Sequence, residues 1–122
     1  MIGYLTVGVR DVNKAAAFYG DLLESLGAKI LMSMDRIAFI GESMGSPMLA
    51  VCTPYDENDP TPGNGNMVAI SAGTKEAVDA LHAKALTMGA TDEGAPGQRL
   101  PTFYGAYVRD LDGNKLCFYV MG

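Results

Sequence analysis

YVRDLDGNKLCFYV, residues 107–120, is the stretch that decides the fold of this chain. An apolar run enters a turn built from Asp110, Asp112, Gly113 and Asn114, and a second apolar run leaves it. Glycine adopts positive φ without a steric penalty, and Asp and Asn side chains hydrogen-bond the backbone of a turn. The pattern therefore predicts an antiparallel hairpin of two strands at the end of the chain.

An earlier stretch copies this hairpin. Residues 38–52, AFIGESMGSPMLAVC, align with residues 106–120 at a constant shift and without a gap. The matched pairs are Phe39 with Tyr107, Gly45 with Gly113, and Leu49 with Cys117. The sequence therefore predicts one structural unit that is used twice.

The first half has the spacing of a β-α-β-β-β unit. Apolar residues recur three and four positions apart from Val12 to Leu26, with Asp11 as the expected N-cap and Gly27 as the expected end of the helix. Strands are predicted before and after this helix at residues 4–9, 29–33, 36–41 and 48–52.

The second half repeats the order. A strand at 67–72 precedes a helix that begins after Thr74 and ends before Gly89. A short strand is expected between 89 and 94, and 94–101 reads as a loop. Strands at 103–109 and 115–120 complete the unit.

Together these patterns predict an α+β fold of two βαβββ modules. Residues 53–66 are polar and rich in proline and glycine, which is typical of a linker. We expect a single domain, residues 1–122, made of module 1 (1–55), a linker (56–65) and module 2 (66–122). Each half alone is too small to bury its sheet, so the two are expected to act together.

Composition narrows the function classes. A chain of 122 residues with 48% hydrophobic residues is expected to fold as a globule, and its net charge of −5 disfavours nucleic acid or an anionic membrane as partner. No apolar run approaches the roughly 20 residues that span a bilayer. The first ten residues lack the pattern of a signal peptide, and two cysteines suit a reducing cytoplasm.

The chain resembles the vicinal oxygen chelate superfamily, which includes glyoxalase I, bleomycin-resistance proteins and extradiol dioxygenases. The similar segments are VRDV at 9–12 leading into AFY at 17–19, GNMVAI at 65–70, and VRDLDGNKL at 108–116. The resemblance implies that the two modules are related by a pseudo-twofold axis and curl their strands into an open half-barrel cleft. It also implies a homodimer, as in many members.

Metal-dependent members of this family hold a divalent ion with His and Glu at four equivalent strand positions. The resemblance places those positions at Tyr4, Leu49, Met67 and Cys117, with Ala50 in place of Leu49 if the register slips by one. None of these is His, Asp or Glu, the ligands such an ion needs. We therefore expect no metal and no other cofactor.

The remaining reactive side chains have simpler roles. His82, the only histidine, is expected on the helix beside its apolar stripe. Cys117 has no histidine near it in sequence to act as a base, so a buried thiol is expected. Asp110 and Asp112 are accounted for by their turn. We assign no catalytic residue.

A cleft without a metal would bind a small molecule. Strand alternation and the family geometry give the pocket candidates, which are Tyr4, Thr6, Leu49, Met67, Ala69, Phe103, Tyr104, Cys117 and Tyr119. Arg99 could meet an anionic ligand, although exposure to solvent is the simpler expectation.

Three functions remain open at this level. The first is binding or sequestration of an apolar or aromatic small molecule, which we favour. The second is a lyase, isomerase or dioxygenase, either metal-free or with the metal held by non-standard ligands. The third is a structural or regulatory dimer whose cleft is filled by its own side chains.

Overall fold

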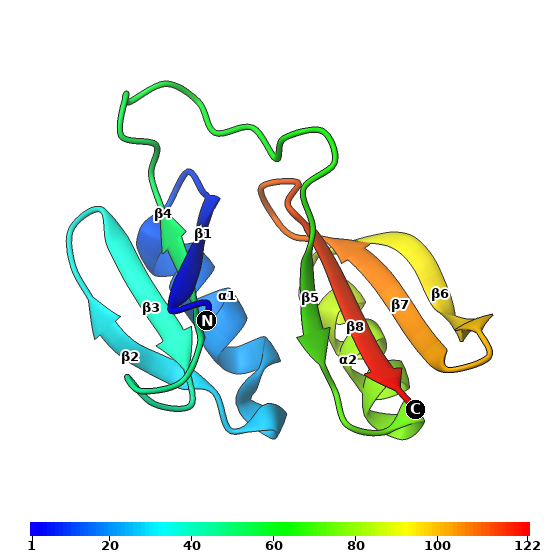
Figure 1. Cartoon of the computed structure of the whole chain (residues 1–122). Helices are drawn as coiled ribbons and strands as arrows, with labels where there is room; N and C mark the ends of the chain where they lie inside the picture. Colours follow the sequence, from blue (N-terminus) through cyan, green and yellow to red (C-terminus); the bar gives the residue numbers. More distant parts are fainter. The chain divides into compact units, whose positions relative to one another are not determined.

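A computed structural model describes all residues, 1–122, and they form two compact units, Met1–Pro62 and Gly63–Gly122. The division falls inside the predicted linker, and we call the two units module 1 and module 2. Each contains a four-stranded sheet and one α-helix in the order β-α-β-β-β (Figure 1). The predicted α+β fold with an internal repeat is confirmed. No helix is long and apolar enough to span a membrane.

Module 1 follows the predicted order. Its elements are β1 (Tyr4–Gly8), α1 (Val12–Leu22), the 3₁₀ turn η1 (Glu24–Leu26), β2 (Lys29–Ser33), β3 (Ile37–Gly41) and β4 (Met48–Cys52). The strand order is β1-β4-β3-β2, with β1 parallel to β4 and the other neighbours antiparallel. The last strand of the module therefore lies between its first strand and the hairpin.

Helix α1 begins as predicted but ends earlier. The Asp11 side chain accepts a hydrogen bond from the Lys14 N–H at 3.0 Å, which caps the first turn. The prediction of one helix up to Gly27 was wrong, because the α-helix ends at Leu22 and a 3₁₀ turn follows. The tighter turn satisfies carbonyl groups that have no partner at a helix end, and Gly27 closes it with φ of 84°.

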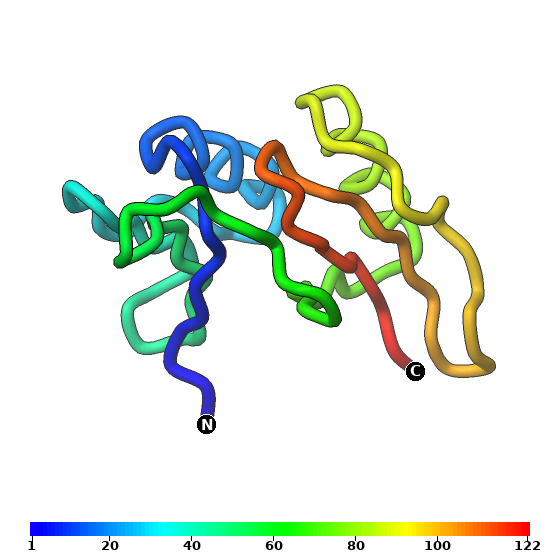
Figure 2. Tube along the Cα trace, turned by 90° about the horizontal axis from the view of Figure 1, so that it is seen from above, coloured from blue at the N-terminus to red at the C-terminus, as the bar shows by residue number.

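Module 2 contains β5 (Val68–Ser71), α2 (Lys75–Thr87), β6 (Thr91–Leu100), β7 (Phe103–Arg109) and β8 (Lys115–Met121). Its strand order, β5-β8-β7-β6, is that of module 1 with β5 parallel to β8. Thr74 caps α2 as predicted by accepting a hydrogen bond from the Ala77 N–H at 3.0 Å. In Figure 2 the chain trace shows β6 and β7 running side by side as one long ribbon.

The predicted loop at 94–101 was wrong. Residues 94–100 belong to β6, which pairs with β7 through several register shifts. Glycine and proline in this stretch suggested a loop, but β6 is the edge strand of its sheet. An edge strand tolerates proline and bulges because only one of its sides must pair.

The two β-hairpins differ by one residue in their turns. Phe39 pairs with Ala50 in module 1, and Tyr107 pairs with Cys117 in module 2. The connection is 42–47 in the first hairpin and 110–114 in the second, so the first is one residue longer. The gapless alignment was therefore wrong beyond the turn, and Ala50 rather than Leu49 corresponds to Cys117.

Each sheet has a face that packs against its helix and a face that does not, which we call the open face. The helix-side residues form the core and are the most buried apolar side chains; they include Val7, Ala38, Ile40, Leu49, Val51, Ala106, Val108, Leu116 and Phe118. Helix α1 covers module 1 with buried residues such as Tyr19 and Leu22, and α2 covers module 2 with Val78, Leu81 and Ala85. The open faces carry the alternate side chains of the same strands.

His82 packs between α2 and its sheet. Its ring is buried, and Nε2 lies 2.9 Å from Oδ1 of Asp92 at the start of β6. Because an ionised carboxylate only accepts hydrogen bonds, Nε2 carries the proton and donates it. The prediction that His82 is a helix-packing residue is confirmed.

This contact makes stability depend on pH. The hydrogen bond from His82, followed by one from the Gly94 N–H, holds the pKa of Asp92 below its ordinary value of 3.8. The folded pKa is lower than the unfolded one, so ionised Asp92 stabilises the fold above about pH 4 and this contribution disappears as the pH falls through the folded pKa.

Relative to Asp92→Asn, the wild type should be more stable at pH 6, and the difference in the free energy of unfolding should shrink steadily below pH 4. Urea unfolding at a series of pH values measures this, with Asp35→Asn as an exposed control; a constant difference would contradict it.

Candidate functional site

The open face of module 2 gathers four of the nine predicted pocket residues, which are Ala69, Phe103, Cys117 and Tyr119. Cross-strand pairing places Ala69 beside Cys117 and Phe103 beside Met121 on this side of the sheet. The same pairing adds residues that sequence reasoning missed, Tyr107 opposite Cys117 and Lys115 opposite Arg109. Pairing across the predicted hairpin turn would have located them, because directly opposed residues share a face.

An aromatic platform occupies this face. The rings of Phe103 and Tyr119 stack with centroids 5.4 Å apart and planes 6° from parallel, and both are only partly buried. Gly105 lies opposite Tyr119, and a Cβ atom at this position would come within 2.8 Å of the Phe103 ring. Because Gly105 has no side chain, it leaves the space in which the Phe103 ring lies flat over the strand.

Two cations lie at the third ring of this face. The Arg99 guanidinium carbon is 5.5 Å from the centre of the Tyr107 ring, and the Lys115 amino nitrogen is 5.4 Å from it. Both distances are in the range of a cation–π contact. Arg99 also donates a hydrogen bond to the Ala95 carbonyl, so its side chain folds back along β6.

Cys117 lies beneath these groups. Its side chain is fully buried, and this burial raises the pKa of its thiol, although a hydrogen bond with Tyr107 acts in the opposite direction. Cys117 is therefore part of the floor of the open face, and it is poorly suited to be a nucleophile. Both cysteines are free.

Thiol reactivity is expected to differ between the two cysteines. Cys52 is half-buried whereas Cys117 is fully buried, so 5,5′-dithiobis(2-nitrobenzoate) should react quickly with Cys52 alone in the native protein. The second thiol should appear only in guanidinium chloride. Cys52→Ser should abolish the fast phase; a fast phase that survives this substitution would show that Cys117 is accessible.

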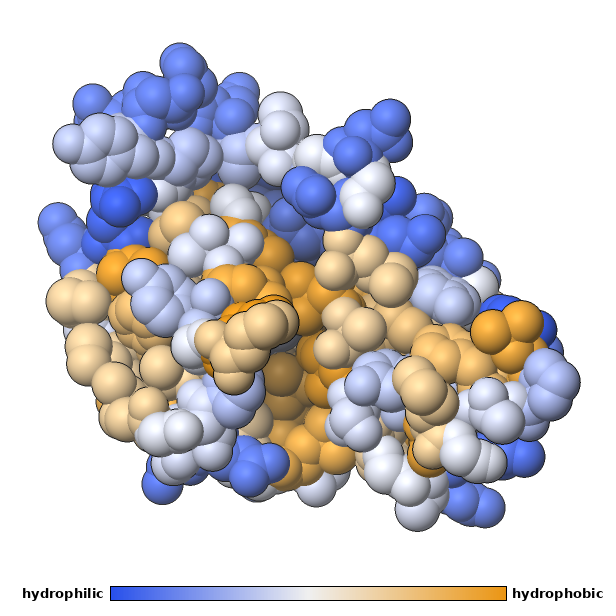
Figure 3. Space-filling model, in the orientation of Figure 1, coloured by the Kyte–Doolittle hydropathy of each residue, from blue (hydrophilic) through white to orange (hydrophobic).

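The open face of module 1 carries a groove of about 560 Å³. Tyr4, Thr6 and Cys52 line its floor, and the linker forms its other wall. The linker stays close because Pro60 packs against Gly8, where a Cβ atom would come within 2.9 Å of the proline ring. Figure 3, viewed in the orientation of Figure 1, shows apolar residues over the strands of this module and hydrophilic residues over the linker.

Tyr4 is the most prominent side chain of this groove. It is 52% exposed, and its ring contacts that of Phe39 edge-on with centroids 5.0 Å apart. Arg36 and Tyr55, which sequence reasoning did not select, form a cation–π pair at 5.3 Å beside it. Their proximity depends on the path of the linker, for which the sequence offered no pattern.

Three predicted pocket residues are placed differently. Leu49 pairs with Leu5 and Ile40 and is buried on the helix side, as the one-residue difference between the hairpins requires. Tyr104 also points to the helix side, where its hydroxyl donates to Oδ1 of Asp79 at 2.7 Å. That hydrogen bond raises the pKa of Tyr104. Met67 is half-exposed just before β5 rather than within the strand.

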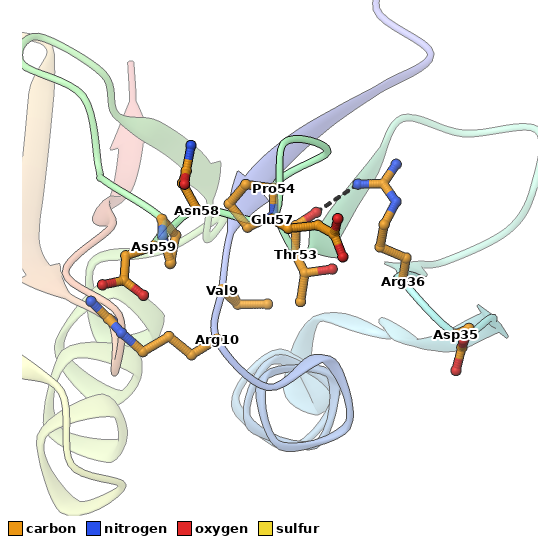
Figure 4. A pocket seen from close by; sticks show the side chains of 10 residues that line it. Val9, Arg10, Asp35, Arg36, Thr53, Pro54, Glu57, Asn58 and Asp59 are labelled. Atoms are coloured by element: carbon orange, nitrogen blue, oxygen red, sulfur yellow. Dashed lines mark hydrogen bonds between the residues drawn. The ribbon is translucent and has the colours of Figure 1, made fainter.

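Two further hollows were not anticipated. One of about 590 Å³ lies where β1 and β4 end, with Arg10 and Asp59 on one side, Arg36 on the other, and Glu57 between them (Figure 4). Arg36 is held there by a hydrogen bond from Nη1 to the Thr53 carbonyl at 2.6 Å. The walls of this hollow carry both positively and negatively charged side chains. The other, about 260 Å³, lies at the end of β8 and is lined by Lys75, Gln98 and Tyr104.

The residues that the resemblance places at metal positions do not fit a divalent ion. Tyr4, Met67 and Cys117 offer a phenol, a thioether and a buried thiol, and Ala50 offers no ligand atom. Carboxylates and imidazoles are the usual ligands of such ions. No group of three or more His, Cys, Asp or Glu side chains in the chain is arranged to hold a metal ion.

Similarity to known proteins identifies the family to which the chain belongs. Residues 1–118 match the Glyoxalase/Bleomycin resistance protein/Dioxygenase superfamily, and the chain belongs to this family. No protein with a curated description matches.

Solved structures agree with the assignment. A glyoxalase/bleomycin resistance protein from Albidiferax ferrireducens T118 is 34% identical, with a TM-score of 0.87 over 98% of this chain and 97% of that one. A hypothetical protein from S. aureus is 26% identical with a TM-score of 0.75, covering 98% and 92% of the two chains. A family enzyme from Burkholderia phytofirmans PsJN, 21% identical with a TM-score of 0.77 over 96% and 95%, shares the fold.

Proposed function

We propose that this protein binds a small, planar and largely apolar molecule on the open faces of its sheets, without a metal ion. The observation that carries the proposal is the stacked pair of Phe103 and Tyr119 on the open face of module 2. Aromatic rings whose only role is packing in the core are normally buried. The rings of Phe103 and Tyr119 remain partly exposed and present a flat surface. A flat aromatic surface binds a planar ligand by stacking and by burial of apolar area.

The groove of module 1 supports the same function. Its volume of about 560 Å³ is in the range of small-molecule sites. Its floor combines the exposed Tyr4 ring with the Thr6 hydroxyl, an apolar surface with a polar group that can orient a ligand. Met32, which pairs with Phe39 in the same sheet, adds flexible apolar surface that adapts to ligand shape.

Binding without metal chemistry follows from the donor set. A Lewis-acid mechanism needs residues that hold the ion, and the phenol, thioether and thiol at the family's positions are poor ligands for the divalent ions concerned. The Cys117 thiol, whose pKa is raised by burial, is poorly suited to act as a nucleophile. The proposal is therefore for a binding or sequestering member of the family.

Ligand-induced stabilisation tests this proposal. A neutral fluorescent probe, N-phenyl-1-naphthylamine, should bind saturably, and at ten times its Kd it should stabilise the fold by about 1.4 kcal/mol, which raises Tm by roughly 5 °C. Prior saturation of the protein with zinc chloride should leave the affinity unchanged. Absence of saturable binding for both this probe and an anionic analogue would overturn the proposal.

A further inference from the structure

We propose that the molecule bound on the open face of module 2 is an anion, a planar aromatic carboxylate, sulfonate or phosphate whose negative group lies at Tyr107 beside Arg99 and Lys115. This inference rests on the proposed function, because it specifies the charge of the ligand and where that charge is held. The sequence left open whether Arg99 meets an anionic ligand or only faces solvent, and in the structure its side chain is exposed and lies over the ring of Tyr107.

The first support is that these two cations have no carboxylate partner. Arg109, the third cation of this face, forms an ion pair with Glu93 at 3.0 Å. Arg99 donates a hydrogen bond to a backbone carbonyl instead, and the Lys115 amino group lies over the ring. Acidic residues outnumber lysines and arginines by 14 to 9 in this chain. Two uncompensated positive charges on one ring therefore form a local field of opposite sign to the molecule as a whole.

The second support is that β6 leaves space for Arg99 to lie over the sheet. A Cβ atom at Gly97 would come within 2.7 Å of Nη1 of Arg99, and one at Gly94 would lie 3.5 Å from Nη2 and 3.0 Å from the Tyr107 ring. A side chain at Gly97 would therefore displace the guanidinium, and a side chain at Gly94 would crowd the Tyr107 ring beneath it. A guanidinium held in this way presents the paired N–H groups that bind a carboxylate or phosphate in a bidentate manner.

The third support is that the charge lies next to an aromatic surface. Tyr107 pairs with Cys117, and Tyr119, one half of the stacked pair, follows on the same side of β8. Both cations also lower the pKa of the Cys117 thiol, against the larger opposing effect of burial, so their field reaches the floor of the face. A ring on the platform and an anion at Tyr107 are therefore compatible within one small molecule.

A matched pair of probes tests the inference. 1-Anilinonaphthalene-8-sulfonate carries the negative charge, and N-phenyl-1-naphthylamine has the same ring system without it. The wild type should bind the sulfonate about tenfold more tightly than the amine. Arg99→Gln and Lys115→Gln should each weaken sulfonate binding about tenfold and change amine binding less than about twofold, as measured by fluorescence titration.

Two further variants sharpen the test. Lys75→Gln is the matched control, because its amino group lies 5.4 Å from the Tyr104 ring on the helix side of the same sheet. This variant should change neither affinity. Gly97→Ala keeps every charge but displaces the Arg99 guanidinium, and it should weaken only sulfonate binding. Far-ultraviolet circular dichroism and Tm confirm that each variant is folded before its titration is interpreted.

The outcomes separate the two proposals. Equal affinity of the two probes, or sulfonate binding that survives both Arg99→Gln and Lys115→Gln, would overturn the anion inference and leave the binding function in place. Sulfonate binding weakened equally by Lys75→Gln would also overturn it, since the effect would then be one of net charge. Failure of both probes to bind would overturn the proposed function itself.

Discussion

Replacement of Asp110 by alanine is expected to lower the free energy of unfolding by about 3 kcal/mol, because this carboxylate holds together the turn between β7 and β8. Asp110 is buried, and its Oδ1 accepts hydrogen bonds from the N–H groups of Asp112 at 2.9 Å and Asn114 at 2.8 Å. Its Oδ2 accepts a third from the Asn114 amide at 3.0 Å. Alanine removes the carboxylate that accepts from these three donors, two of which are buried.

The corresponding turn of module 1 supplies the control. There a hydrogen bond of 3.1 Å between the hydroxyls of the exposed Ser43 and the partly buried Ser46 takes the place of the buried network. Ser43→Ala should therefore cost less than about 0.5 kcal/mol. Urea unfolding followed by circular dichroism gives both values. A loss below about 1 kcal/mol for Asp110→Ala would mean that water replaces the carboxylate and that the turn does not depend on it.

Removal of the aromatic platform is expected to have the largest effect on binding. Phe103→Ala and Tyr119→Ala should each weaken binding of N-phenyl-1-naphthylamine about tenfold, and the double variant roughly thirtyfold or more, because each substitution also removes the stacking partner of the other ring. Both rings are partly exposed, so the fold should survive either single change.

Leu86→Ala is a suitable comparison for the platform variants. Leu86 is an exposed apolar residue on α2, away from the open face, so its truncation removes apolar surface without touching the platform. Probe affinity should stay within about twofold of the wild type. If Phe103→Ala and Tyr119→Ala behave like Leu86→Ala, the probe binds elsewhere, and the platform is not the binding surface.

Much of the fold could be predicted from local pattern. The turn from Asp110 to Asn114 was predicted because glycine and the Asx side chains have strong conformational preferences. The two helix N-caps, Asp11 and Thr74, were predicted for a similar reason, since their side chains bond the backbone within the next turn. The predictions were wrong where tertiary pairing overrode a local conformational preference. Strand β6 forms in a glycine- and proline-containing stretch because β7 offers it a partner.

The candidate site was less predictable because it depends on register. Alternation assigned Thr6, Ala69 and Tyr119 to the open faces correctly, since their strands were located to within a residue. One additional residue in the first hairpin was enough to move Leu49 to the helix side. A shift of one position inverts the side on which every later residue of a strand lies, and sequence similarity alone did not show where that residue had been inserted.

The sequence by itself determined the duplicated βαβββ plan and the turn at Asp110, because each depends on residue type or on neighbours within a few positions. Only the tertiary structure decided that Arg99 meets Lys115 at the ring of Tyr107, that Tyr104 and Leu49 turn toward the helices, and that His82 donates to Asp92. Those contacts join residues from different elements. They depend on strand register and on the space that glycines leave, which no local pattern specifies.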